Sequence, residues 1–302
     1  MNTINKNLIV ILGPTASGKT SLSLRLATSL KTEIISCDSR QFYKELLIGS
    51  CPPKKTELQK INHHFIQNMS IEKDYNVGDF ERDAIKKINE LFKKYDKLIM
   101  VGGSGLYADA VCSGLDEIPR SSQKIRESIQ KEYTEKGLKW LQDTVKKIDY
   151  KFYLECDKKN PVRLMRALEV YKSTGKKFSF FRKKTKIKRS FSITKIGLKW
   201  DRKILYQRIN LRVDSMMKDG LLNEVMSLEK FKKNNALQTI GYNELFDYLD
   251  RKINLDEAVE KIKINSRRFA KRQMTWLKKD SEIKWFSNKE KYEVIEDFIL
   301  QH

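Results

Sequence analysis

The feature that most constrains the fold is the glycine-containing segment at residues 13–20 (GPTASGKT), which lies between an apolar run and a helical pattern. The apolar run, residues 8–12 (LIVIL), is typical of a parallel strand buried on both faces. Leu22, Leu26 and Leu30 recur at four-residue intervals, as on one face of a helix. In a G-x-x-x-x-G-K-[ST] segment at such a junction, backbone N–H groups turn inward around phosphate oxygens, and the helix N-terminus adds partial positive charge. We therefore expect an α/β domain that binds a phosphorylated ligand.

The whole segment is expected to hold a diphosphate or a triphosphate. Lys19 supplies a positive charge, and the Thr20 hydroxyl is placed to bind Mg²⁺. ATP-hydrolysing enzymes add a carboxylate at the end of another core strand, whereas the strand predicted at residues 97–101 ends in Gly102 and Gly103. An ordinary nucleotide hydrolase is therefore not favoured. The predicted phosphate-binding residues are Gly13, Pro14, Thr15, Ala16, Ser17, Gly18, Lys19 and Thr20.

The first third of the chain continues this alternation of strands and helices. Residues 33–36 and 97–101 (KLIMV) are strand candidates, and residues 80–94 form an amphipathic helical pattern before the second of them. Strands that alternate with helices imply right-handed crossovers and a parallel sheet.

Residues 116–189 have a different pattern. Residues 122–175 contain no convincing strand, and Pro161–Thr174 is typical of a helix that ends at Gly175. Six of the eight residues at 182–189 are basic. We expect an all-helical insertion at 116–189. It interrupts a P-loop NTPase-like core of residues 1–115 and 190–302, whose C-terminal part is helical after a further strand at 192–200.

Asp38 is the main acidic candidate for catalysis. It follows the second predicted strand, and an Asp just past the carboxyl end of a parallel strand lies in the crevice where such sheets bind ligands. The alternative is that Asp38 or Ser39 is the N-cap of a helix, a role that both residue types favour. From the residues alone the two interpretations have equal weight.

The net charge points to a polyanionic partner. Lys and Arg number 61 against 39 Asp and Glu, which gives +22, and neutralising phosphates releases counterions. Lysines spread over any solvated surface are the alternative, so clustering must decide. Residues 258–279 read as a helix with a capping box at Asn254 and Glu257. One side holds Val259, Ile262, Phe269, Trp276 and Leu277, and the opposite side holds Arg267, Arg268, Lys271, Arg272, Lys278 and Lys279. We expect this basic side to contact phosphates rather than to be a merely solvated face.

The remaining composition excludes several classes of protein. The four cysteines and three histidines form no metal-binding spacing and no disulfide framework. No signal-peptide pattern is present at the N-terminus, and no apolar run approaches the roughly 20 residues of a membrane span. We expect a cytoplasmic protein with no membrane partner.

Six blocks in fixed order resemble the tRNA dimethylallyltransferases, also called tRNA isopentenyltransferases. The blocks are GPTASGKT, DSRQFYKELLIG, VGGSGLY, NPVRLMRALEVYKSTGK, GYNEL and RRFAKRQMTW, and the resemblance extends from residue 9 to about residue 286. The resemblance implies a monomeric, Mg²⁺-dependent enzyme. It would transfer the dimethylallyl group of dimethylallyl diphosphate to N6 of adenosine 37 in a tRNA anticodon stem-loop. No zinc-finger pattern occurs before His302, which favours the bacterial type.

The resemblance also assigns roles to individual residues. Asp38 matches the residue that accepts the adenine N6 proton, Ser104 keeps a hydroxyl at a usual Thr position, and Arg212 matches the arginine that holds the diphosphate, with Arg208 as the alternative. The residues implied in tRNA binding are Asp38, Ser39, Arg40, Gln41, Ser104, Arg126, Arg163, Arg166, Gln238, Gly241, Tyr242, Arg268, Lys271 and Arg272. Asn243 departs from the family, which commonly has a basic residue there, so its role stays open.

Three other functions remain as alternatives. A prenyltransferase acting on free AMP, ADP or ATP would share the chemistry but would not need the basic helix. A nucleoside or nucleotide kinase would share the phosphate loop but leaves DSRQFY and RRFAKRQMTW unexplained. A non-catalytic RNA-binding protein would not need Asp38 or Arg212.

Overall fold

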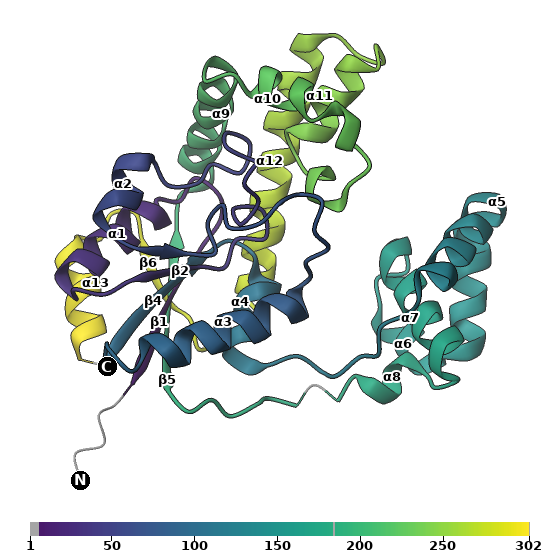
Figure 1. The fold of residues 1–302 in the computed structure, drawn as a ribbon, viewed down its shortest axis with the longest axis horizontal. Helices are drawn as coiled ribbons and strands as arrows, with labels where there is room; N and C mark the ends of the chain where they lie inside the picture. The colour runs from purple at the N-terminus through teal and green to yellow at the C-terminus, as the bar shows by residue number, and fades with distance from the viewer. Residues whose placement is uncertain (1–5, 184, 302) are drawn as a thin grey trace. The chain divides into compact units, whose positions relative to one another are not determined.

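The structure is a computed structural model that describes residues 6–183 and 185–301. Lys184, part of the predicted basic connector, lies outside the described residues. The chain divides into two compact units, one of Met1–Cys112 with Arg189–His302 and one of Ser113–Lys188 (Figure 1). The boundaries of the second unit, Ser113 and Lys188, are within three residues of those predicted for the insertion at residues 116–189.

The first unit is built on one six-stranded, all-parallel sheet with the order β3-β2-β4-β1-β5-β6. Four of the strands confirm the sequence prediction. The two edge strands, β3 and β6, were missed because one has only two residues and the other combines Lys and Ser with two aromatic residues. The strands are β1 (Asn7–Leu12), β2 (Ile34–Ser36), β3 (His63–His64), β4 (Lys97–Gly102), β5 (Ser192–Lys199) and β6 (Lys284–Ser287).

Helices cover both faces of this sheet. Alternate residues of β1 face opposite ways, so Ile9 and Ile11 pack beneath α1 (Lys19–Ser29) and α13 (Tyr292–Leu300). Leu8 and Val10 belong to the larger core with α3 (Val77–Leu91), α4 (Gly105–Ser113) and the C-terminal helices. A further short helix, α2 (Lys55–Lys60), precedes β3. Both faces of β1 are therefore buried, as the apolar run predicts.

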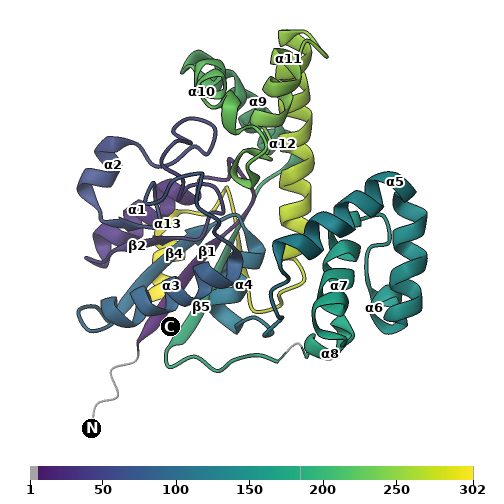
Figure 2. The ribbon, with the colours of Figure 1, turned by 45° about the vertical axis from the view of Figure 1, so that its right-hand side comes forward.

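The C-terminal helices confirm the predicted character of this region. They are α9 (Arg202–Lys218), α10 (Leu221–Ser227), α11 (Tyr242–Leu249) and α12 (Leu255–Leu277). The capping box of Asn254 and Glu257 begins α12, as predicted. Figure 2 shows α12 as one long helix that runs from α11 towards α4. There Trp276 Nε1 donates to Asp109 Oδ2 at 2.8 Å, which fixes the end of α12 to α4.

The second unit is all helical over its described residues. Its helices are α5 (Gln123–Ile148), α6 (Tyr150–Glu155), α7 (Pro161–Thr174) and α8 (Phe178–Phe181), and α7 has the predicted bounds. Gly175 ends α7 at φ 69°, a left-handed conformation that favours glycine. Asp149 is buried, accepts from Ser179 N and Ser179 Oγ at 2.7 Å each, and so joins α6 to α8. No helix among the described residues of the chain combines the length and apolarity needed to span a bilayer.

Candidate active site

The phosphate-binding segment forms a tight loop between β1 and α1. Gly18, the residue before α1, has φ 86°, a conformation that would be strained in a residue with a side chain. Lys19 Nζ donates to Pro14 O at 2.7 Å, so the ammonium group lies against the loop. Ser17 Oγ is buried and has no hydrogen-bond partner in the described residues. A Cβ on Gly13 would lie 2.9 Å from this oxygen, so the hydroxyl faces the Gly13 backbone, and Ser17 does not line the cavity at the ends of the strands.

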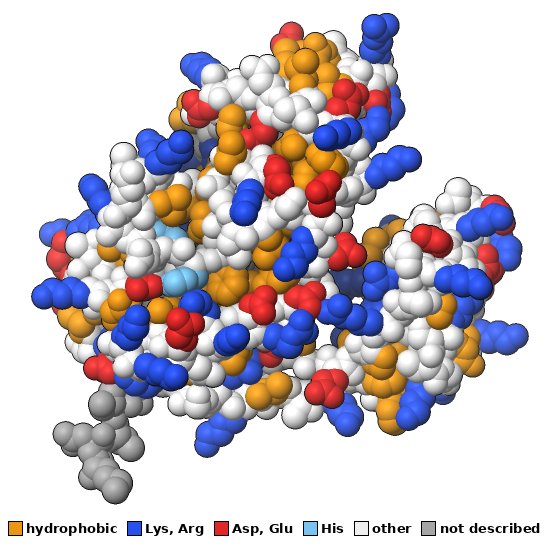
Figure 3. Space-filling model, in the orientation of Figure 1, with side chains coloured by type: hydrophobic (Ala, Val, Ile, Leu, Met, Phe, Trp, Pro, Cys, Tyr) orange, Lys and Arg blue, Asp and Glu red, His pale blue; other side chains and the backbone are white. Residues whose placement is uncertain are grey.

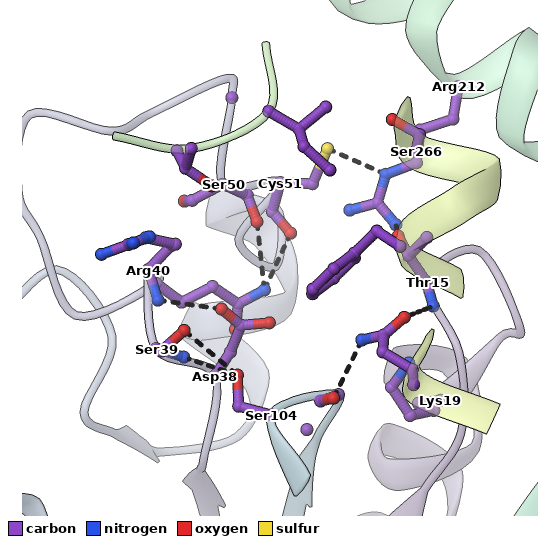
Figure 4. A pocket seen from close by; sticks show the side chains of 18 of the residues that line it. Thr15, Lys19, Asp38, Ser39, Arg40, Ser50, Cys51, Ser104, Arg212 and Ser266 are labelled. Carbon is purple, nitrogen blue, oxygen red and sulfur yellow. Dashed lines mark hydrogen bonds between the residues drawn. The ribbon is translucent and has the colours of Figure 1, made fainter. Parts of the chain in front are cut away.

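A cavity of about 450 Å³ lies at the carboxyl ends of the strands. Figure 4 shows Asp38, Ser39 and Arg40 on one side of the cavity and Thr15, Lys19 and Arg212 on the other. Residues of the loop after β4, of α9 and of α12 complete the wall. Residues from distant regions of the chain therefore meet at the edge where parallel sheets bind ligands.

Asp38 lies in a turn that Ser104 supports. Asp38 Oδ1 accepts from Arg40 N at 2.9 Å, and the turn continues without a helix. The helix-cap interpretation is therefore wrong. Ser104 Oγ accepts from Ser39 N at 3.1 Å, which connects the loop after β4 to the Asp38 turn. The second carboxylate oxygen of Asp38, Oδ2, is therefore available to accept a proton in the cavity.

Two cations stand at the phosphate end of the cavity. Arg212 Nη1 donates to Thr15 Oγ1 at 3.2 Å, and Arg212 Nε donates to Cys51 Sγ at 2.9 Å. Burial, and secondarily the charge of Arg212, lowers the pKa of Lys19 to about 8. The proximity of two positive groups is unfavourable without an anion between or beside them. This end of the cavity therefore suits a di-anionic or more highly charged group.

The structure favours Arg212 over Arg208 as the diphosphate ligand. Arg208 is exposed, donates from Nε to Ala16 O at 2.8 Å, and stacks at 4.3 Å on the ring of Trp200. Trp200 Nε1 in turn donates to Ser17 O at 2.9 Å. Arg212 lines the cavity and Arg208 does not, although both arginines border a second, more open hollow against residues 16–20.

The residues present fit a magnesium ion that keeps most of its ligands from water and substrate. Thr20 lines the cavity in the first turn of α1, where its hydroxyl can bind a metal ion. No cluster of three or more His, Cys, Asp or Glu side chains suited to a metal exists in the described parts of the chain. Mg²⁺ commonly binds through few protein groups together with phosphates and water, so the donor set matches this ion.

The inner face of α12 differs from the prediction at two residues. Phe269 is 38% exposed and lines the cavity, so it is not part of the buried side. Arg267 Nη1 donates to Asn210 Oδ1 at 2.7 Å, which ties α12 to α9 and removes Arg267 from the free basic side. Both differences arise because α12 contacts α9 and the cavity along one edge, a contact that periodicity alone does not show.

The outer face of α12 carries the predicted exposed cations. Arg268, Lys271 and Arg272 are exposed, and none of them forms an ion pair with another described residue. Figure 3 shows basic side chains over the whole visible face of the molecule, with acidic ones between them. Total charge therefore does not locate an RNA surface, whereas three unpaired cations within five residues beside the cavity are a specific feature.

Two of the predicted tRNA contacts are buried, and a third is held by hydrogen bonds within the protein. Tyr242 is 0% exposed and donates to Glu224 Oε1 at 2.6 Å, and Gly241 before it is buried at φ 97°. Gln41 has both ends of its amide engaged, with Ser36 Oγ at 3.0 Å and Cys51 O at 3.0 Å. Gly241 and Tyr242 support the site from within, whereas Gln41 also lines the cavity and its predicted contact with RNA stays a prediction. Gln238 and Asn243, which are exposed on either side of Gly241 and Tyr242, line the cavity.

The predicted tRNA residues of the helical unit divide in the same way. Arg166 donates to Pro119 O at 2.9 Å and Glu169 Oε2 at 3.2 Å, so its guanidinium fixes the start of the unit. Arg126 is exposed and donates to Ser121 Oγ at 3.1 Å. Arg163 is exposed on α7. Of the three, Arg163 is the most available for a phosphate.

The cavity wall includes polar residues that were not predicted to act there, among them four with defined contacts or positions. Cys51 binds Arg212, Ser266 and Gln273 come from α12, and His63 comes from β3. His63 Nδ1 donates to Ile61 O at 2.7 Å, and its buried Nε2 has no partner in the described residues. Burial lowers the pKa of His63, which favours a neutral ring whose Nε2 accepts hydrogen bonds. No sequence spacing indicates these contacts, because they join segments far apart in the chain.

Comparison with known proteins gives one consistent result. A family model described as IPP transferase matches residues 41–280. A tRNA dimethylallyltransferase of Christiangramia forsetii is 50% identical over 292 residues, 97% of each chain, and that of Flavobacterium psychrophilum is 51% identical over 288 residues, 93% of this chain and 94% of the other. The crystal structure of a tRNA isopentenylpyrophosphate transferase from Bacillus halodurans has TM-score 0.72 and 35% identity, covering 98% of this chain and 96% of the other. A eukaryotic dimethylallyltransferase acting on tRNA has TM-score 0.81 and 25% identity, covering 98% and 80%.

Proposed function

Because the chain belongs to the IPP transferase family, whose matched members are tRNA dimethylallyltransferases, we propose that its cavity joins dimethylallyl diphosphate to one adenine of a tRNA anticodon loop. The observation that carries the proposal is the placement of the Asp38 carboxylate across one cavity from Lys19 and Arg212. A carboxylate at one end and paired cations at the other suit a reaction that releases a proton and a diphosphate.

The donor diphosphate binds at the loop between β1 and α1. Lys19 and Arg212 contact its oxygens. When bound with the diphosphate, Mg²⁺ at the Thr20 hydroxyl neutralises further negative charge. Fixed cations of this kind favour bond cleavage because they stabilise the charge that develops on the leaving group.

Transfer then forms one C–N bond and breaks one C–O bond. The adenine N6 lone pair attacks the first carbon of the dimethylallyl group, and the electron pair of the breaking C–O bond leaves with the diphosphate. The N6 amine is a weak nucleophile, so Asp38 accepts its proton as the new bond forms. Arg40 N holds one Asp38 oxygen, which orients the carboxylate for this step.

The target base must leave its stack to reach Asp38, as other enzymes that act on bases require. Arg268, Lys271 and Arg272 hold the RNA backbone beside the cavity, and Gln238 and Asn243 in its wall contact the loop nucleotides. We expect the protein to act in the cytoplasm as a monomer.

The test is a single incubation with dimethylallyl diphosphate, Mg²⁺ and an unmodified anticodon stem-loop, followed by mass analysis of its nucleosides. We expect one dimethylallyl group on one adenosine, and no product without Mg²⁺. A stem-loop that stays unmodified while free AMP is prenylated would overturn RNA as the acceptor. Full activity in metal-free buffer would overturn the role of Mg²⁺.

A further inference from the structure

One side chain of α12 touches both loops of the active site. Gln273 Oε1 accepts from Thr15 N at 2.9 Å, and Gln273 Nε2 donates to Gly103 O at 2.9 Å. Thr15 belongs to the phosphate loop, and Gly103 precedes Ser104. The contact with Thr15 spans 258 positions of the chain, and the contact with Gly103 spans 170.

The orientation of this amide follows from its partners. A backbone N–H can only donate, so Thr15 N must meet the oxygen of Gln273. A backbone carbonyl can only accept, so Gly103 O must meet the nitrogen. The side chain is 8% exposed, and a Cβ on Gly103 would lie 2.4 Å from Gln273 Nε2. The fit is close, and an ionised Glu or a Lys at this position could satisfy only one of the two partners.

Each partner leads to a group that the reaction uses. Thr15 Oγ1 accepts from Arg212, so the Thr15 position affects the cation that holds the diphosphate. Gly103 is followed by Ser104, whose Oγ accepts from Ser39 N beside Asp38. A shift of Gln273 would therefore move both ends of the cavity relative to each other.

We propose that Gln273 is a positioning residue that fixes the distance between the diphosphate site and the Asp38 turn. This inference rests on the proposed function and names a residue for which the sequence indicated no role. Gln273 lies on the same helix as the exposed cations Arg268, Lys271 and Arg272, but its side chain is buried in the protein. Its loss should therefore affect donor binding and the chemical step without weakening RNA binding.

Two variants separate the two hydrogen bonds. Gln273→Met keeps the length of the side chain and removes both bonds. Gln273→Glu keeps the acceptor for Thr15 N but places a second oxygen against Gly103 O. Thr275→Ala, an exposed change on the same helix, is the matched control. Each protein is measured for the transfer rate at saturating substrates, the donor KM, the Kd of inorganic diphosphate, the Kd of the stem-loop, and the Tm.

We expect the transfer rate of Gln273→Met to fall by about 10²-fold, because a misplacement of roughly 1 Å at a reacting centre costs that much. The donor KM and the diphosphate Kd should rise, the stem-loop Kd should be unchanged, and Thr275→Ala should resemble wild type. The transfer rate of Gln273→Glu should approach that of wild type as pH falls, because a protonated carboxyl group can donate to Gly103 O. The transfer rate of Gln273→Met should not recover in this way.

A lower Tm with wild-type rate and donor KM would show that Gln273 is only structural and would overturn the proposal. A stem-loop Kd that rises in proportion to the lost rate would also overturn it, because the effect would then act through RNA binding. If wild type transfers nothing to the stem-loop, the proposed function fails instead. The diphosphate Kd then still tests whether Gln273 positions the phosphate loop.

Discussion

The cations of this protein fall into two groups with opposite surroundings. Lys19 and Arg212 are held inside the cavity by hydrogen bonds to Pro14 O, Thr15 Oγ1 and Cys51 Sγ. Arg268 and Lys271 project from the outer face of α12 into solvent, and Arg272 is exposed at the rim of the cavity, where it lies over the ring of Phe269. The first group is fixed before any ligand arrives, and the second can adjust to a flexible polyanion.

This difference separates chemistry from affinity. Desolvated cations in fixed positions act strongly on a small anion and on the charge of a transition state. Exposed cations act through counterion release, which contributes affinity that depends on salt but carries little specificity. Substitutions in the first group should therefore lower donor affinity and the transfer rate, and substitutions in the second should lower RNA affinity, each without the other effect. Asp38 lies where the two substrates meet.

The largest effect is expected for Asp38→Asn. Asn keeps the acceptor for Arg40 N but cannot take up the N6 proton, so the transfer rate should fall by about 10²–10⁴-fold. Binding of diphosphate and stem-loop should persist. Single-turnover rates with both binding constants measure this, and near-normal transfer with a Tm several degrees lower would show that Asp38 has only a structural role.

The next largest effect is expected for Lys19→Ala and Thr20→Ala. Removal of the ammonium group or the metal-binding hydroxyl should lower the transfer rate by about 10²–10³-fold, because each stabilises the departing diphosphate. Ser21→Ala, at an exposed position of α1, is the control. Loss of stem-loop affinity in either variant, measured by filter binding, would contradict the separation of the two cation groups.

Replacing Arg268, Lys271 and Arg272 together by Ala should weaken RNA binding and its salt dependence. The log–log slope of stem-loop Kd against salt should fall in magnitude by about 2–3, because roughly 0.7–0.9 counterions are released per neutralised phosphate. A triple change of Lys86, Lys93 and Lys94 to Ala, exposed residues on and after α3, removes the same charge elsewhere. Equal slopes for the two triple variants would remove α12 from the RNA interface.

A pH effect should distinguish the buried group from the exposed one. The pKa of free Lys19 is about 8, and a bound anion raises it, so diphosphate binding takes up a proton above that pH. Measured relative to Lys19→Arg, in which the titration of diphosphate itself is the same, the affinity should be constant below pH 8 and should fall above it by up to about tenfold per pH unit. Calorimetry with inorganic diphosphate in two buffers measures the proton uptake, and Lys19→Arg, which stays charged, should remove the part of the pH dependence that Lys19 causes. A flat profile for wild type relative to Lys19→Arg would contradict the lowered pKa.

The smallest effect is expected at Cys51. Cys51→Ala removes one hydrogen bond from Arg212 and should lower the diphosphate affinity by about two- to tenfold, whereas Cys51→Ser should keep most of it. Alkylation of the Cys51 thiol should be slowed by inorganic diphosphate. Unchanged alkylation at saturating diphosphate would place the anion away from Arg212.

The sequence predicted local features well and contacts between distant segments poorly. The phosphate loop, β1, α7 and the cap of α12 depend on neighbouring residues, so periodicity and capping residues indicate them. The role of Tyr242 was wrong and Gln273 was missed, because burial and pairing across more than a hundred residues depend on how α12 packs against the sheet. Phe269 was predicted to lie in the core because its side chain is apolar, but in the structure it lines the cavity.

The most direct test measures two ligands against two variants. Inorganic diphosphate and an unmodified stem-loop are titrated into wild type, Lys19→Ala and the Arg268/Lys271/Arg272 triple variant at the same salt concentration. We expect Lys19→Ala to lose affinity for diphosphate and to keep its affinity for the stem-loop, and we expect the triple variant to show the reverse. A variant that loses both ligands by the same factor would contradict the division between a buried donor site and an exposed RNA surface.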